Sequence, residues 1–315
     1  MGETATIKRS FVIGTRGSLL ARAQCRIVQE ELAARHSDDA WLMKEIKTQG
    51  DIDRNVSLAS LGGQGVFVRA LEEGLLAGDI DLAVHSLKDM PTELPPGLKI
   101  GAVLSRKDAR DVLISRTGCD LDSLPEGAVV GTGSLRRTAQ LLCYRPDLAM
   151  RDIRGNVDTR LRKLHEHQYD ALVLAAAGLA RLGRGHLIGQ YLSMEVMLPS
   201  VGQGALAIEV REDDEAVIRR VEPLNHPATE LAVRAERGFL AALGGGCAVP
   251  VAAFAEVANR RIHLIGMVAD PAGGRCIRRG LAGPASQPES LGRRLAERLL
   301  NRGARELLQE AVSGK

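Results

Sequence analysis

The sequence predicts an α/β protein that ends in a smaller α+β region. Through most of the chain, short apolar runs alternate with helix-like apolar stripes, which is typical of sheets covered by helices. Beyond Gly244 the pattern changes to strands joined by short turns and a closing helix, which favours an antiparallel unit. The chain of 315 residues is long enough for two or three domains.

The composition indicates a folded protein and argues against two classes. An apolar fraction of 45% can fill hydrophobic cores, so the chain is not disordered. A net charge of +3 and 3% aromatic residues are low for a nucleic-acid-binding protein, which more often has a basic excess or aromatic side chains that stack on bases. No apolar stretch approaches the ~18 residues of a membrane span, and the N-terminus lacks the apolar segment of a secretory signal.

The cysteines point to a reducing compartment. The five are scattered and form no Cys-x-x-Cys pair, so we expect reduced thiols in a cytoplasmic protein. His165-Glu166-His167 resembles a fragment of a metal site, but it continues a polar helical pattern, and an exposed helix face is the favoured interpretation. We therefore predict no metal site and no nucleic-acid or membrane partner.

The first part of the chain alternates strands with helices. Short apolar runs mark the strands, and apolar residues at helical spacing mark the helices. The predicted strands are residues 11–14, 41–46, 80–84 and 98–104, and the predicted helices are residues 19–32 and 66–75.

A second α/β series follows. Its turn Gly131-Thr132-Gly133-Ser134 echoes Gly14-Thr15-Arg16-Gly17-Ser18, which suggests two similar halves. A buried strand at 205–210 follows a glycine-rich turn and can return to the first sheet, which would make the first domain discontinuous. The predicted strands of the second series are residues 112–115, 128–130, 150–153 and 171–174, and its helices are residues 137–143 and 159–167.

The last part of the chain has a different pattern. A long helix over residues 229–243 ends at Gly244, a normal helix stop. One closing amphipathic helix is marked by leucines between residues 291 and 308. Between these helices the predicted strands are residues 249–255, 261–268 and 275–279.

Three loops that carry arginine lie where a predicted strand ends and a helix begins. In α/β folds the carboxyl ends of strands form the ligand crevice, and free N–H groups at the following helix favour anions. Guanidinium groups at several such turns predict a ligand with many carboxylates or phosphates. The alternative is that they are surface arginines in a chain with 42 Lys and Arg. The arginines concerned are Arg16, Arg136, Arg137 and Arg154.

Two further segments carry reactive side chains. After the strand at 80–84, Asp89 can hold a cationic N–H or move protons, and Lys88 can bind an anion; the alternative is a surface ion pair. We interpret His85 as a core histidine. Three glycines precede Cys247, whose thiol can be a nucleophile or a covalent anchor, or else a small buried side chain at a helix cap.

Taken together, these segments resemble the porphobilinogen deaminase (hydroxymethylbilane synthase) family over nearly the whole chain. Six motifs occur in order and at family-like spacing. They are Gly14-Thr15-Arg16-Gly17-Ser18, Ala83-Val84-His85-Ser86-Leu87-Lys88-Asp89-Met90-Pro91, Gly131-Thr132-Gly133-Ser134-Leu135-Arg136-Arg137, Ile153-Arg154-Gly155-Asn156-Val157-Asp158-Thr159-Arg160, Val201-Gly202-Gln203-Gly204 and Gly245-Gly246-Cys247.

The resemblance implies a fold of three domains. Two are α/β domains like periplasmic binding proteins with a cleft between them, residues 6–104 with 200–222 and residues 105–199. The third is a small C-terminal α+β domain, residues 223–315, that carries Cys247.

The resemblance also implies a reaction and a cofactor. Four porphobilinogen molecules are joined head to tail, each losing ammonia, and the linear tetrapyrrole hydroxymethylbilane is then hydrolysed from a dipyrromethane primer. That primer is implied to be attached to Cys247 through a thioether. The resemblance further implies a cytoplasmic monomer of porphyrin and heme biosynthesis that passes its product to uroporphyrinogen-III synthase.

Particular residues take roles from the same resemblance. Each pyrrole unit carries an acetate and a propionate, so the growing chain is a polyanion that basic side chains can neutralise. Asp89 would contact pyrrole nitrogens and stabilise the azafulvene cation formed when ammonia leaves. The cofactor would be held by Asp89, Lys88, Ser134, Arg136, Arg137 and Cys247. The substrate would be bound by Arg16, Ser18, Arg154, Arg160, Arg181 and Gln203.

One departure and two alternative functions remain open at this point. Many relatives have lysine where this chain has Gln64, in a glycine-rich segment that can act as a flap. The difference puts a contact between this flap and a carboxylate in doubt, but not the activity. An anion-binding protein of the two-lobed type would normally carry an export signal and would not need Cys247. A nicotinamide oxidoreductase is disfavoured because Arg136 stands where a dinucleotide fingerprint ends in glycine.

Overall fold

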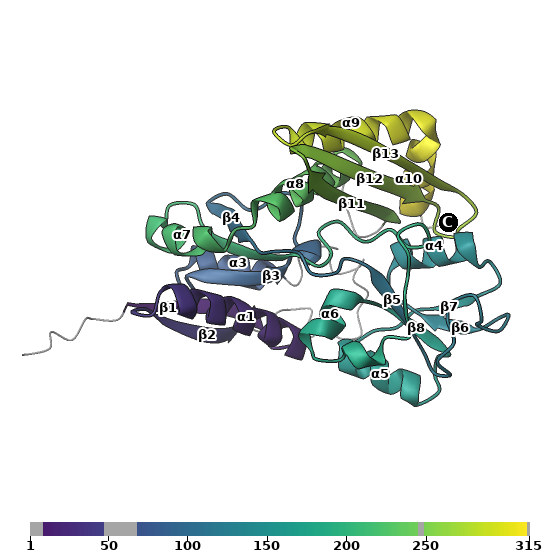
Figure 1. Cartoon of the computed structure of the whole chain (residues 1–315), viewed down its shortest axis with the longest axis horizontal. Coiled ribbons are helices and arrows are strands. Elements are labelled where there is room, and N and C mark those ends of the chain that lie inside the picture. Colours follow the sequence, from purple (N-terminus) through teal and green to yellow (C-terminus); the bar gives the residue numbers. More distant parts are fainter. Residues whose placement is uncertain (1–8, 47–67, 245–248, 314–315) are drawn as a thin grey trace, which may run out of the picture. The chain divides into compact units, whose positions relative to one another are not determined.

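A computed structural model describes residues 9–46, 68–244 and 249–313 (Figure 1). The chain forms two compact units. The first contains Met1–Ser105 and Leu206–His226, and the second contains Arg106–Ala205 and Pro227–Lys315. The strand after the glycine-rich turn belongs to the first unit, where it pairs with residues 82–86.

The first unit is built on a five-stranded sheet of order β2-β1-β3-β10-β4. Strands β1, β2 and β3 are parallel, whereas β10 runs antiparallel to both of its neighbours. Its elements are β1 (Ser10–Arg16), α1 (Leu19–Arg35), β2 (Ala40–Ile46), α3 (Arg69–Leu76), β3 (Leu82–Ser86), β4 (Leu98–Val103), β10 (Leu206–Arg211) and α7 (Glu215–Val221).

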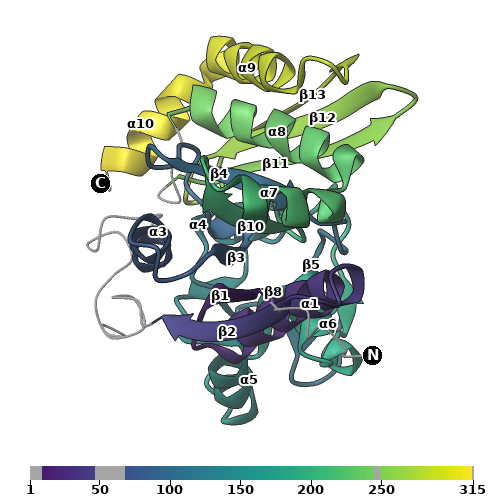
Figure 2. The same ribbon diagram turned by 90° about the vertical axis from the view of Figure 1, so that its left-hand side faces the viewer.

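Apolar side chains cover both faces of this sheet. On one face, Val28 of α1 and Val217 of α7 pack with Phe11 and Ile13 of β1. Figure 2 shows α1 lying against β1 and β2. On the other face α3 contributes Leu71 and Leu75. A sheet buried on both faces explains the nearly continuous apolar runs of its strands.

The second unit contains a sheet with the same arrangement, in the order β7-β6-β8-β5-β9. Here β6, β7 and β8 are parallel and β5 is antiparallel to both β8 and β9. The predicted likeness of the two halves is therefore confirmed at the level of strand order. Its elements are β5 (Asp111–Ser115), β6 (Val129–Gly131), α4 (Leu135–Tyr144), β7 (Ala149–Arg151), α5 (Val157–His165), β8 (Ala171–Ala175), α6 (Ala176–Arg181) and β9 (Gln190–Tyr191).

The C-terminal part of the second unit has its own antiparallel sheet, β11-β12-β13, and its own core. The prediction of one closing helix is wrong, because the chain bends at Arg302 and Gly303, and the φ of Gly303 is +97°. Glycine adopts this left-handed conformation without the steric cost of a side chain. The elements are α8 (Pro227–Ala242), β11 (Val251–Ala258), β12 (Arg261–Ala269), β13 (Cys276–Pro284), α9 (Pro288–Leu299) and α10 (Arg305–Ser313).

A buried carboxylate links this C-terminal part to loops of the α/β part of the same unit. Glu236 of α8 is fully buried and accepts hydrogen bonds from the guanidinium of Arg106 at 2.7 and 2.8 Å. It also accepts hydrogen bonds from the N–H groups of Gly202 and Ala255, at 2.7 and 2.8 Å. Because a buried carboxylate is stable only when its oxygens are paired, these contacts hold both parts in one compact unit.

Candidate active site

In the first unit, Asp89 lies at the carboxyl end of β3. Residues Leu87–Asp89 form one turn of 3₁₀ helix directly after the strand. Leu87 and Met90 are buried, whereas Asp89 is exposed and Lys88 is half-buried. The apolar neighbours therefore fix a turn that presents the Asp89 carboxylate outward.

The interpretation of His85 as a core histidine is confirmed. It is 5% exposed, and its Nε2 lies 2.9 Å from Oε2 of Glu209 on β10. Glu72 of α3 is also buried, and its pKa is raised by burial and then by the charge of Glu209. Three titratable groups are thus enclosed between α3 and the sheet.

The end of β1 carries two further predicted residues. Arg16 is the last residue of β1 and is half-buried. Ser18 is the N-cap of α1, and its hydroxyl accepts a hydrogen bond from the N–H of Ala21 at 3.2 Å. Serine is favoured at this position because its hydroxyl satisfies an otherwise unpaired N–H of the first turn.

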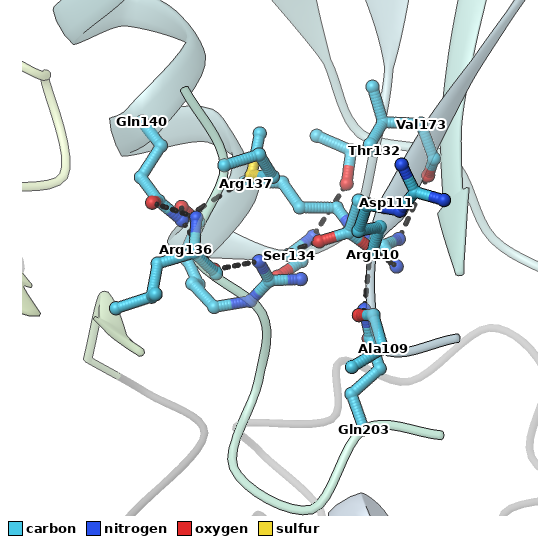
Figure 3. A network of polar contacts seen from close by, with 12 residues as sticks. Ala109, Arg110, Asp111, Thr132, Ser134, Arg136, Arg137, Gln140, Val173 and Gln203 are labelled. Atoms are coloured by element: carbon cyan, nitrogen blue, oxygen red, sulfur yellow. Dashed lines mark hydrogen bonds and ion pairs between the residues drawn. The ribbon is translucent and has the colours of Figure 1, made fainter. Parts of the chain in front are cut away.

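In the second unit, Arg136 and Arg137 converge on one carboxylate at the start of α4 (Figure 3). Arg137 donates from Nε and Nη2 to Oδ1 of Asp111, at 3.1 and 2.8 Å. Arg136 Nη1 lies 2.8 Å from Oδ2 of the same carboxylate. Arg136 and Arg137 are each 6% exposed and Asp111 is fully buried. Ser134 is the N-cap of α4 but makes no side-chain capping hydrogen bond.

Asp111 was missed by the sequence analysis. The only signal was a charged residue directly before the apolar run at 112–115. Gln203, predicted to bind substrate, is 1% exposed and donates to Oδ1 of Asp111 at 3.0 Å and to the carbonyl of Ala109 at 2.7 Å. Its substrate contact remains a prediction.

Arg160 is close enough to the same cluster to interact electrostatically with Arg137. Its Nε donates to the carbonyl of Gly155 at 2.8 Å. Burial, and after it the positive charge of Arg137, lower the pKa of Arg160 to about 10. The group stays protonated at neutral pH and adds positive charge beside Arg137, with Asp152 as a nearby carboxylate.

The other two predicted arginines differ in burial. Nη2 of Arg181 donates to the carbonyl of Gly204 at 2.7 Å, and burial lowers the pKa of Arg181 to about 10. Arg154 is exposed, and its Nε lies 2.9 Å from Oδ2 of Asp152. The second unit therefore brings Arg136, Arg137 and Arg160 together, whereas Arg154 lies on an exposed loop.

Some predictions fall outside the part of the chain that the structure describes, namely Cys247 and Gln64. Within the described residues, no group of His, Cys, Asp and Glu side chains is suited to a metal ion. Across the same residues, every helix is too short or too polar to span a bilayer.

The fold and site define a class of protein with two α/β sheets of equal strand order, of which one carries a buried cationic cluster suited to organic anions. A family model described as porphobilinogen deaminase, dipyromethane cofactor binding domain, matches residues 11–219. A second, described as the C-terminal domain of porphobilinogen deaminase, matches residues 230–301. The chain belongs to the porphobilinogen deaminase family.

Curated relatives support the same assignment. A porphobilinogen deaminase of Geobacillus kaustophilus is 50% identical over 302 residues, which cover 96% of this chain and 97% of the relative. One of Desulforudis audaxviator is 50% identical over 308 residues, which cover 98% of this chain and all of the relative. The chain is thus an enzyme of tetrapyrrole biosynthesis that acts on porphobilinogen and has a dipyrromethane cofactor domain.

Among solved structures, the chain is similar to an arginine-specific periplasmic binding protein of Salmonella typhimurium. The identity is 12% and the TM-score is 0.38, with 69% of this chain and 91% of that chain covered. A likeness of this degree carries no argument, and the α/β architecture rests on the strand orders described above.

Proposed function

We propose that the chain joins four porphobilinogen molecules head to tail on a dipyrromethane primer and then releases hydroxymethylbilane by hydrolysis. The observation that carries the proposal is the cluster of Arg136 and Arg137 around Asp111, with Arg160 nearby. This cluster holds more positive than negative charge in a buried setting. Pyrrole acetates and propionates are the anions that would complete it.

Asp89 is the proposed catalytic residue. Loss of ammonia leaves a substrate cation, and a fixed carboxylate stabilises such a cation more effectively than water does. The exposed position of Asp89 in a turn held by the buried Leu87 and Met90 supports this role, because the carboxylate is accessible while its backbone is held. Lys88, in the same turn, would neutralise a carboxylate of the bound pyrroles.

Different basic and hydroxyl side chains would bind the carboxylates of the cofactor and those of the substrate. Ser134, Arg136 and Arg137 would hold the cofactor. The donor chemistry fits, since guanidinium groups bind carboxylates through paired N–H donors. The substrate and the growing chain would be bound by Arg16, Ser18, Arg154, Arg160, Arg181 and Gln203.

Dipyrromethane, when bound, supplies the end to which new pyrrole units are added. We propose that Cys247 holds it through a thioether, because this thiol follows a run of three glycines that leaves the backbone free to present it. A cytoplasmic location agrees with the five scattered cysteines. We further propose that the enzyme is a monomer and that its product passes to uroporphyrinogen-III synthase.

Intact mass spectrometry tests the proposed attachment. The purified chain should exceed its sequence mass by two pyrrole units, and Cys247→Ser should lose that adduct because an alcohol is a far weaker nucleophile than a thiolate. Cys143→Ser, which changes an exposed thiol, is the matched control and should keep the adduct. An active wild-type chain without the adduct would contradict the proposal, as would an adduct retained by Cys247→Ser.

A further inference from the structure

We propose that Asp111 is a positioning residue for cofactor loading, which orients Arg136 and Arg137 and leaves one positive charge for a pyrrole carboxylate. This inference rests on the proposed role of the two arginines in holding dipyrromethane. Asp111 itself is placed behind them as the residue that fixes their geometry, without contact to the cofactor.

The geometry of the carboxylate supports this role (Figure 3). Oδ1 accepts hydrogen bonds from Arg137 and from the side-chain amide of Gln203, and Oδ2 faces Arg136. Each guanidinium is also held at a second point, Arg136 by the carbonyl of Leu198 at 2.7 Å and Arg137 by the carbonyl of Val173 at 2.8 Å. Two anchors on a planar group fix its orientation as well as its position.

A further side chain holds one of these anchors in place. The Gln140 amide donates to the Leu198 carbonyl at 3.0 Å and accepts from the Leu198 N–H at 2.7 Å. The carbonyl that receives Arg136 is therefore fixed by α4 itself. Arg136 makes its contacts to Leu198 and Asp111 through Nη1, so both partners lie on one side of the guanidinium.

The charges in the cluster favour one additional anion. Two buried arginines face a single carboxylate, which leaves a net charge of about +1 on the three side chains at neutral pH. Burial lowers the pKa of Arg136, Asp111 opposes that effect, and the charge of Arg137 adds to it. A second carboxylate would relieve the remaining repulsion.

A purely structural pair would need only one arginine. One buried arginine and one buried aspartate are already neutral, whereas a second buried cation adds a desolvation penalty without a matching charge. Proteins keep such uncompensated groups mainly at functional sites. We therefore infer that the surplus positive charge serves to bind a ligand. Asp111 sets the amount of this charge and the direction in which it points.

The test uses Asp111→Glu and Asp111→Asn, with Asp108→Asn as the control. Asp111→Glu keeps the charge but moves it by one methylene, and Asp111→Asn keeps the shape but removes the charge. Asp108 pairs with Arg110 in an exposed position three residues away, so its loss removes a nearby carboxylate without touching the cluster. Cofactor-free chains are incubated with porphobilinogen, and the adduct is followed by intact mass.

For Asp111→Glu we expect the porphobilinogen concentration at half-maximal loading to rise about tenfold, because small displacements of positioning groups can cost up to ~100-fold. The thermal midpoint should stay near that of the wild type. Asp111→Asn should load less well still, and Asp108→Asn should match the wild type.

Three outcomes would overturn the inference. These are loading of both variants at the wild-type concentration, loading that falls only in proportion to the folded fraction, and loss of the fold in both variants. The last two would make Asp111 a structural residue. A wild-type chain that never acquires an adduct would instead overturn the proposed function, so the two failures are distinguishable.

Discussion

The two α/β sheets have the same strand order but opposite buried charge. In each sheet, the strand that runs antiparallel next to the three parallel strands carries a buried acid. This acid is Glu209 on β10 in the first unit and Asp111 on β5 in the second. Glu209 meets His85 and lies in the field of Glu72, so its cluster is rich in carboxylates. Asp111 meets two arginines, so its cluster is rich in cations.

Equal strand order therefore does not determine the chemistry of a sheet. The carboxylate-rich cluster is closed within the first unit, and the side chain that faces outward nearby is Asp89, a group suited to a cation. The cation-rich cluster lies at the first turn of α4, where the N–H groups also favour anions. One sheet is therefore suited to a developing positive charge and the other to bound carboxylates.

The largest effect on turnover is expected when the charge of Asp89 is removed. Asp89→Asn should lower turnover at least ~100-fold, because the amide keeps the shape but cannot stabilise a cation, whereas Asp89→Glu should keep a small residual rate. Single-turnover kinetics on cofactor-loaded protein measures both. Glu93→Gln, an exposed acid in the same unit, is the control and should run at the wild-type rate. A near-normal rate for Asp89→Asn would move the catalytic charge to another residue.

The cationic side of the comparison can be tested on one helix. Arg160→Leu should lower turnover about tenfold and accumulate intermediates of defined length, because a bidentate partner for a carboxylate is lost. Arg162→Leu is the matched control, since Arg162 is exposed and pairs only with Glu166 among the described residues. Mass spectra at limiting substrate would reveal the intermediates. Equal, mild effects of both changes would mean that the arginines act as a diffuse positive field.

Local pattern was sufficient to predict most of the fold. Apolar spacing placed β1, β2, α4 and α8 to within a few residues, since each buries a face whose period is visible in sequence. The return of 205–210 to the first sheet was also predictable, because a glycine-rich turn precedes a run that is apolar except for Glu209. The two-residue strand β9 was not, since it carries too few residues for a pattern.

The candidate site was predicted only in part, for a physical reason. Arginines at strand ends are visible in sequence, but the carboxylate that holds them is not. Asp111 is 26 residues from Arg137 and 92 residues from Gln203, and only the antiparallel course of β5 brings them together. The break at Gly303 was missed because the leucine stripe continues on both sides of it.

A smaller effect, on stability, is expected for alanine substitutions at two glycines in corresponding strands of the two sheets. A Cβ on Gly131 of β6 would lie 2.6 Å from Leu172 and 2.8 Å from the ring of Tyr169, whose hydroxyl is fixed on the carbonyl of Asp152. A Cβ on Gly14 of β1 would meet the flexible ends of Ile80 and Leu71. Gly131→Ala should therefore cost ~1–3 kcal/mol in urea unfolding, and Gly14→Ala less. Equal costs would mean that the two strands pack alike.

The smallest expected effect concerns Glu72. Its pKa is raised in the folded chain, first by burial and then by Glu209, against the weaker pull of His85 and Arg69. A raised carboxyl pKa favours folding only while the group is protonated, and that contribution is lost as the pH rises through the folded pKa. Ionised Glu72 should therefore destabilise the fold at neutral pH.

Glu72→Gln removes that charge at nearly constant shape. The thermal midpoint at pH 7 should rise by about 2 °C, since 1 kcal/mol corresponds to roughly 2–4 °C in chains of about 150–250 residues. The gain should vanish below about pH 4, where Glu72 is protonated in both the folded and the unfolded chain. Glu93→Gln, an exposed acid of the same unit, is the control and should leave the midpoint unchanged at both pH values. A lower midpoint for Glu72→Gln at pH 7 would mean that the ionised carboxylate stabilises the cluster, and the contrast in buried charge between the two sheets would then have to be explained by ion pairing in both.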